Sequence, residues 1–345
     1  GGGIEVVNGS VVLTDSALNE NEAGPVGSAN PGNGGGLHVT GSATVFVTNT
    51  EVIGNVAANE GGGLWNQAGS TMYVNMGSYI GFNLVTGLNA NDGGGGIFNN
   101  MGSLSISDST LDRNAANGSG GGVFNNGGSV SIVRSTLSGN FAGSASSAGG
   151  GGLFNSSGAD ARIVNSTFSG NTANHNGGGI ENFGSVSIFN STLVLNRANE
   201  DALGAPNGGS GGGIHTLSGA FTELYNTIVA GNRRFANTVD DDINGGMVFA
   251  GSSFNIVGNA VTSGGLTDAV NSNIVGVGGI GTRALATIVS PTLGDNGGPT
   301  LTHALVAGSV GINSGGVGFL PAGVTTDQRG FPRLNGILDR GAFEL

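Results

Sequence analysis

Apolar and polar residues alternate in short segments that recur along most of the chain. The segments "SLSIS" (residues 103–107) and "SVSIV" (residues 129–133) place every second side chain on the same side of an extended backbone, which is the period of a strand. These segments are short, rich in apolar residues and bounded by Gly, Asn and Ser. The pattern therefore predicts strands rather than helices.

The alternating segments belong to a sequence repeat with eight copies. Each copy begins with a Gly-Gly-Gly triplet and an apolar residue, and it ends with an asparagine 16 to 19 residues later. The opening apolar residues are Ile4, Leu37, Leu64, Ile97, Val123, Leu153, Ile180 and Ile214. The closing asparagines are Asn21, Asn55, Asn83, Asn114, Asn140, Asn171, Asn196 and Asn232. An apolar residue three positions before each closing asparagine should stack in a core column, which in four consecutive copies contains Leu111, Leu137, Phe168 and Leu193.

This repeat is typical of a parallel β-helix, in which each copy forms one coil. We predict an all-β fold: a single right-handed parallel β-helix over residues 1–290, with about nine to ten coils and three short strands per coil. Beyond residue 290 the repeat is lost and prolines accumulate. Residues 291–345 are therefore expected to form an irregular C-terminal capping segment of the same domain.

Glycine and asparagine have separate roles in this interpretation. The glycine triplets are expected where the chain turns tightly before a strand, with a positive φ or a close approach between backbones. The asparagines are expected to stack their side-chain amides from coil to coil, which satisfies donors and acceptors inside the turns. We interpret them as structural and not as ligands for another molecule.

The connections from each closing asparagine to the next opening residue alternate in length. They measure 16, 9, 14, 9, 13, 9 and 18 residues, so the long ones should project from one corner as a ridge. Insertions on one face of a solenoid often form a binding face. The alternation is equally explained by crowding, because long loops from every coil would clash.

Composition narrows the possible partners. The chain has 345 residues, a net charge of −12, ten basic residues that are all arginine, and no cysteine. A nucleic-acid or anionic-membrane partner would need a basic stripe, and no apolar run approaches the roughly 20 residues of a membrane span. Neither nucleic-acid binding nor membrane insertion is expected. The chain starts inside a repeat, so we interpret it as a product whose signal segment has been removed.

The last fifty residues carry the most specific motifs. The runs "DNGGPTLTHAL" (295–305), "TTDQRGFPR" (325–333) and "DRGAFE" (339–344) resemble the C-terminal signature of bacterial choice-of-anchor Q domain proteins. The repeats also resemble those of polymorphic outer-membrane proteins, which are surface adhesins. The resemblance implies a secreted β-helix displayed at a cell surface, and it supplies neither a catalytic mechanism nor a ligand.

Few residues form a pattern with chemical potential. Asp240, Asp241 and Asp242 are the densest acidic cluster and a candidate Ca²⁺ site, with a solvated acidic turn as the alternative. His38 and His215 share a column but lie six coils apart. Arg329 and Arg333 are expected to pair with Asp327 and Asp339. No pair of nucleophile and base stands out, so neither a catalytic residue nor a cofactor is expected.

One column contains four consecutive aromatic residues, each directly after the opening apolar residue. They are Trp65, Phe98, Phe124 and Phe154. The ladder is either a stack packed within a corner of the fold or an exposed stripe that binds a glycan or a partner protein.

The expected function is that of a non-enzymatic extracellular or cell-surface protein with a structural or adhesive role. The ends of a solenoid have open strand edges, so end-to-end association into a filament is a further expectation. The alternative is a polysaccharide lyase or glycoside hydrolase built on the same scaffold, because fold alone does not determine activity.

Overall fold

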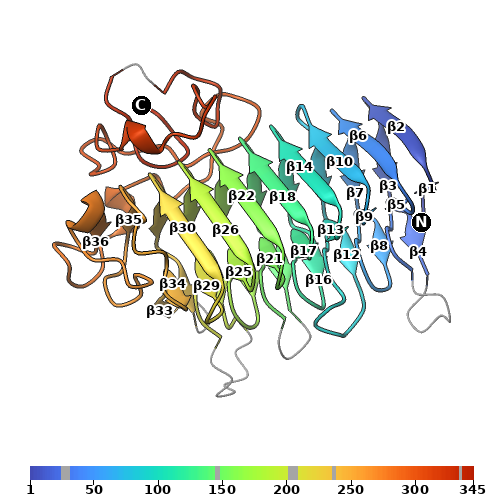
Figure 1. Ribbon diagram of the computed structural model, residues 1–345, viewed down its shortest axis with the longest axis horizontal. Helices are drawn as coiled ribbons and strands as arrows, with labels where there is room; N and C mark the ends of the chain where they lie inside the picture. Colours follow the sequence, from blue (N-terminus) through green and yellow to red (C-terminus); the bar gives the residue numbers. More distant parts are fainter. Residues whose placement is uncertain (25–31, 144–147, 201–208, 235–237, 334–335) are drawn as a thin grey trace.

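The computed structural model of the protein describes residues 1–24, 32–143, 148–200, 209–234, 238–333 and 336–345. Those residues form strands in four long sheets, three short 3-10 turns (Val270–Ser272, Leu285–Thr287 and Val317–Phe319) and no α-helix. Successive strands of the chain enter the four sheets in turn, and neighbouring strands of each sheet pair in parallel, except for β32 with β33. The predicted parallel β-helix is confirmed (Figure 1).

Sheet A contains the strands that begin with the opening apolar residue of each repeat. They are β1 (Ile4–Val6), β5 (Leu37–Val39), β9 (Leu64–Gln67), β13 (Ile97–Asn100), β17 (Val123–Asn126), β21 (Leu153–Asn155), β25 (Ile180–Asn182), β29 (Ile214–Thr216) and β34 (Ile243–Gly245). Sheet B contains the alternating segments. They are β2 (Gly9–Thr14), β6 (Ala43–Thr48), β10 (Thr71–Asn75), β14 (Ser103–Ser107), β18 (Ser129–Val133), β22 (Asp160–Val164), β26 (Ser185–Phe189) and β30 (Phe221–Tyr225).

Sheet C precedes the closing asparagines. Its strands are β3 (Ala17–Asn19), β7 (Glu51–Ile53), β11 (Tyr79–Gly81), β15 (Thr110–Asp112), β19 (Thr136–Ser138), β23 (Thr167–Ser169), β27 (Thr192–Val194), β31 (Ile228–Ala230), β35 (Ile256–Val257) and β36 (Ile274–Val275). Sheet D follows the asparagines. Its strands are β4 (Glu22–Ala23), β8 (Val56–Ala57), β12 (Leu84–Val85), β16 (Ala115–Ala116), β20 (Phe141–Ala142), β24 (Thr172–Ala173), β28 (Arg197–Ala198), β32 (Arg233–Arg234) and the antiparallel β33 (Val239–Asp240).

A coil therefore has four strands, and the predicted number of three is wrong. The missed strands are those of sheet D. Each of them contains only two residues, which is too short for an alternating pattern to show in the sequence.

The core is built from columns of equivalent apolar side chains, as predicted. Leu111 pairs in register with Leu137, Leu137 with Phe168, and Phe168 with Leu193. All four side chains are fully buried. One continuous apolar cluster extends from the first coil to the last.

The closing asparagines form a ladder of buried amides. From Asn21 to Asn232, each Nδ2 donates to the Oδ1 of the next coil at 2.8–3.0 Å. From Asn55 onward the same Nδ2 also donates to a carbonyl of the preceding coil, as Asn140 does to Leu111 at 3.0 Å. A second ladder joins Asn66, Asn99, Asn125, Asn155 and Asn182 in sheet A. The predicted amide stacking is confirmed.

The glycine triplets take the two conformations expected of them. Gly61, the first of its triplet, has φ +65°, and a Cβ on Gly62 would lie 2.4 Å from the carbonyl oxygen of Gly95. Any larger residue at the second position would therefore collide with the next coil.

Every repeat connection runs from sheet D to sheet A, so all emerge at one corner as predicted. Three of the four long connections contain residues 25–31, 144–147 or 201–208, which lie outside the described residues. The predicted ridge of long loops is therefore described only at residues 86–93.

The C-terminal segment is irregular, and its contacts with the solenoid lie on the side of the rod. It folds back along the outer face of sheet C, beside the ends of β18, β22 and β26 (Figure 1). Gln328 donates to Thr136 Oγ1 at 2.8 Å and accepts from Thr167 Oγ1 at 2.6 Å. A second apolar cluster fills the space between this segment and the sheet.

Buried ion pairs hold the C-terminal segment together. Arg329 pairs with Asp327 at 2.8 Å, as predicted. Arg333 is different: its guanidinium, fully buried, pairs with Glu344 at 3.1 Å and donates to Asn165 Oδ1 at 2.9 Å. The expected partner Asp339 instead accepts the backbone N–H groups of Asn313 and Leu345.

Candidate functional site

The aromatic ladder of sheet A is buried. Phe98 and Phe124 have ring centroids 4.8 Å apart, and Phe124 and Phe154 have centroids 4.6 Å apart. The exposed fractions of Trp65, Phe98, Phe124 and Phe154 are 5, 1, 2 and 8%. The chain packs directly on the rings, since a Cβ on Gly93 would lie 2.6 Å from the Phe124 ring. The ladder is the packed stack, and the alternative of an exposed binding stripe is wrong.

The three consecutive aspartates face three different sets of partners. Asp240 pairs with Arg233 at 3.3 Å, and Asp241 accepts from the backbone N–H of Gly211 at 3.0 Å. Asp242 is buried and accepts from Asn232. Across the described ranges, no group of three or more His, Asp or Glu side chains is arranged to hold a metal ion. The site predicted for Ca²⁺ is therefore occupied by structural contacts.

The two column histidines lie apart, each beside its own glutamate. His38 Nδ1 is 3.8 Å from Glu5 and its ring contacts Trp65 at a centroid distance of 4.5 Å. His215 Nδ1 is 3.6 Å from Glu181. Burial lowers the pKa of His38, so its imidazole is mostly neutral near pH 7.

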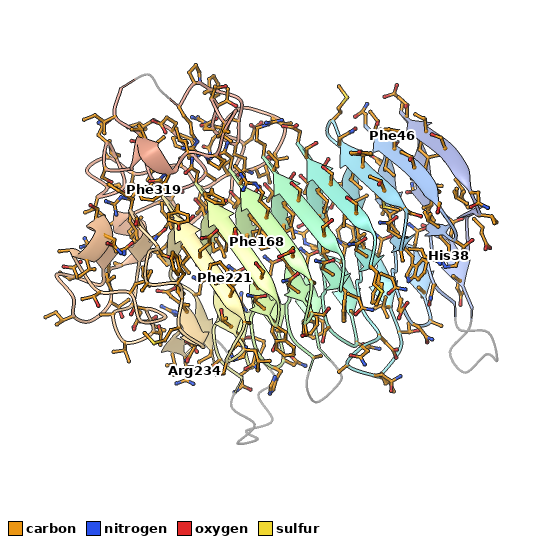
Figure 2. All side chains as sticks on the ribbon, viewed as in Figure 1. His38, Phe46, Phe168, Phe221, Arg234 and Phe319 are labelled. Carbon is orange, nitrogen blue, oxygen red and sulfur yellow. The ribbon has the colours of Figure 1, made fainter. Side chains whose placement is uncertain are left out.

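The outer face of sheet B is the candidate functional surface. It faces the viewer in Figure 2, from Phe46 on β6 to Phe221 on β30. Strand register sorts its side chains into columns across the sheet. The middle column reads Val12, Phe46, Tyr73, Ser105, Ser131, Arg162, Ser187 and Glu223. The face thus changes from aromatic to hydroxyl to charged along the solenoid axis.

A depression that we call the serine hollow occupies the middle of this face. A cavity of about 290 Å³ lies over this depression. The depression forms where small side chains stand between large ones. Its polar lining includes the charged side chains of Asp160 and Arg162 and six serines: Ser103, Ser105, Ser129, Ser131, Ser185 and Ser187. Within the described residues, only Ser187 of these donates its hydroxyl to another side chain, Glu223 at 2.8 Å. The others present donors and acceptors to the solvent.

Large flat side chains stand at one end of the serine hollow and beside Arg162 within it. Phe46 and Tyr73 stack with ring centroids 4.9 Å apart at one end. Inside the hollow the Arg162 guanidinium lies 4.8 Å from the centroid of the Phe189 ring. Phe189 in turn stacks on Tyr225, which contacts Phe319 of the C-terminal segment at 4.9 Å.

The carboxylates of this face are poorly placed for acid–base catalysis. Asp160 and Glu223 stand on β22 and β30, with β26 between them, so strand spacing alone separates them by about 10 Å. Glycosidases need their two carboxylates closer than this in most families. None of the described histidines belongs to sheet B, so the serines have no adjacent imidazole base.

The aromatic residues of sheet B could have been found in the sequence. In "ATVFVT" (43–48) and "TMYVN" (71–75) the apolar residues at the alternate positions are buried, so Phe46 and Tyr73 must point outward. They were not among the predicted site residues, because four consecutive aromatic residues occur only in the column after the glycine triplets. Ser105 and Ser131 follow from the same alternation.

Comparison with protein-family models, with curated proteins and with solved structures gives no match. The described residues contain no helix with the length and apolarity that crossing a membrane requires.

Proposed function

We propose that the protein is a non-enzymatic extracellular or cell-surface protein with a structural or adhesive role. The observation that carries this proposal is the pairing of a rigid scaffold with one open polar face. The amide ladder from Asn21 to Asn232 connects eight coils, and the outer face of sheet B carries the serine hollow. A stiff rod with exposed serine hydroxyls on one face suits attachment.

The resemblance to bacterial choice-of-anchor Q domain proteins also supports display at a bacterial surface. The motifs that carry it supply the residues that dock the C-terminal segment: Thr300, His303, Gln328, Arg333 and Glu344. Export and surface display are what the resemblance implies. End-to-end association into a filament stays part of the proposal, because solenoid ends have unpaired strand edges.

A polysaccharide-active enzyme is the second candidate, and the charged side chains beside the serine hollow favour it. Asp160 and Arg162 lie next to each other on one outer face, where such an enzyme would hold its substrate.

A reducing-end assay on soluble neutral and acidic polysaccharides separates the two candidates. We expect no new reducing ends above the buffer control. Cleavage that is lost in an Asp160→Asn variant and kept in a Glu51→Gln variant, whose carboxylate lies on sheet C, would contradict the non-enzymatic proposal.

A further inference from the structure

The serine hollow continues into a second cavity, and together they run along the solenoid axis. The second cavity, about 480 Å³, follows the glycine turns between sheets A and B and shares Ser103, Ser129 and Asp160 with the first. The two cavities contact residues of β10, β14, β18, β22 and β26. An elongated occupant would therefore lie across the strands.

Most polar groups of the hollow are serine hydroxyls, and Asp160 and Arg162 are the charged side chains that line it. Ser105 and Ser131 are register neighbours, as are Ser103 and Ser129, so hydroxyls repeat at about 4.8 Å along the axis. A hydroxyl both donates and accepts hydrogen bonds, so the floor matches a ligand with many hydroxyls of its own. Tyr73 adds a flat apolar ring beside Ser105 in the same column.

The charges around the hollow argue against an ionic polymer. Asp160, Arg162 and Glu223 are the charged side chains on this face between β14 and β30, two anions and one cation. A phosphate or uronate chain would need several cations in a row. An extended peptide would bind a strand edge and not a sheet face.

From these observations we infer that the serine hollow binds a neutral polysaccharide chain. The chain lies along the solenoid axis, exchanges hydrogen bonds with Ser105 and Ser131, and places one sugar ring against Tyr73. This inference rests on the proposed adhesive function and names its ligand class.

Affinity gel electrophoresis tests the inference with the full chain. Gels contain hydroxyethylcellulose, galactomannan or mixed-linkage β-glucan as neutral polymers, or polygalacturonate or alginate as acidic ones. We expect at least one neutral polymer to retard the protein. Ser131→Tyr, which fills the hollow, and Tyr73→Ala should each weaken that binding at least tenfold. Val12→Ala, in the same column two strands from Tyr73, is the control and should bind as the wild type does.

Circular dichroism verifies that each variant keeps the β-sheet spectrum. The two variants test different parts of the site, because Ser131→Tyr fills the hollow and Tyr73→Ala removes the ring beside it. Retardation by acidic polymers alone, or by no neutral polymer, would overturn the inference. Neutral-polymer binding that survives both Ser131→Tyr and Tyr73→Ala would overturn the assignment to the hollow but leave the adhesive role standing. Loss of binding in both variants would support the assignment to the hollow. If the protein were then found only inside cells, the proposed extracellular function would be overturned instead.

Discussion

A single residue decides how the asparagine ladder ends. Asn232 donates from its backbone N–H and its Nδ2 to Asp242 Oδ1, at 3.0 and 2.9 Å, where a further asparagine would stand in a regular coil. Asp242 Oδ2 accepts from the backbone N–H of Asn259 at 2.8 Å. The oxygens of Asp242 accept these N–H groups, so the ladder ends without leaving an amide donor unpaired.

This arrangement predicts a pH-dependent stability. Burial raises the pKa of Asp242 to about 7, and hydrogen bonds from Asn232 and Asn259 oppose the rise. Because the folded pKa exceeds the ordinary value of 3.8, the folded state binds a proton that the unfolded state releases. The contribution of Asp242 to the free energy of unfolding is therefore fully present below pH 4. It is lost as the pH rises through 7, by at most about 1.4 kcal/mol per pH unit.

The measurement is the free energy of unfolding in urea between pH 4 and 8 for the wild type and for Asp242→Asn. The variant cannot titrate at this position. The free energy of unfolding of the wild type should therefore fall relative to that of the variant as the pH rises through 7. Parallel curves would show that Asp242 has the same pKa in both states.

Interior members of the ladder are predicted to matter more than asparagines at the surface. Asn140→Ala would leave the buried backbone N–H of Asn114 without an acceptor, at about 1–3 kcal/mol, and would remove one bond each from Asn114 Nδ2 and the Leu111 carbonyl. Asn126→Ala removes a half-exposed bond to Asn100 and is the matched control. Chemical denaturation should show a loss of several kcal/mol for the first variant and less than about 1 kcal/mol for the second. Equal losses would mean that the ladder contributes no more than a surface contact.

At the scale of elements, the repeat made the solenoid predictable and left the C-terminal docking unpredictable. Apolar columns and amide ladders recur at fixed positions, so a single register determines all of them. The docking contacts do not recur: Thr136 bonds to Leu301, far away along the chain. The outer face of sheet C does change from Glu51 and Asp112 in early coils to Thr167, Ser169 and Val194 under the segment. That change in polarity is the sequence feature that could have predicted where the C-terminal segment docks.

The candidate site also has a part that the sequence predicts and a part that it does not. Alternation within the strands of sheet B determines that Phe46, Tyr73, Ser105 and Ser131 point outward. Burial of the sheet A ladder depended on the connections that cover it, which differ in length from coil to coil. The sequence alone therefore does not decide whether that ladder is buried or exposed.

Arg333 is predicted to hold the C-terminal segment against the solenoid. Arg333→Leu removes its bonds to Asn165 and Glu344 and leaves Glu344 buried without a cation. The segment should then detach while the coils stay folded, because their columns do not involve it. Limited proteolysis should give a fragment of roughly residues 1–290 with an unchanged β-sheet spectrum. Arg113→Leu, at an exposed ion pair, is the control and should be cut like the wild type. Digestion of the whole chain, or no new cleavage, would contradict this role.

At the scale of the whole molecule, the columns produce a rod whose faces differ. Sheet A is covered at its aromatic ladder, the later coils of sheet C are covered by the C-terminal segment, and sheet B stays open around the serine hollow. The open face therefore runs beside the docked segment, along the length of the rod (Figure 1). A protein of this form can present one surface repeatedly while its scaffold stays rigid.

A rod that acts at the outside of the cell should be visible there by immunogold electron microscopy. Antibodies raised against the purified chain are applied to intact cells that produce it, with cells lacking the gene as the control. We predict gold particles on the outer surface or on extracellular material of intact cells. Labelling that occurs only after the cells are opened, and only in their interior, would contradict the account.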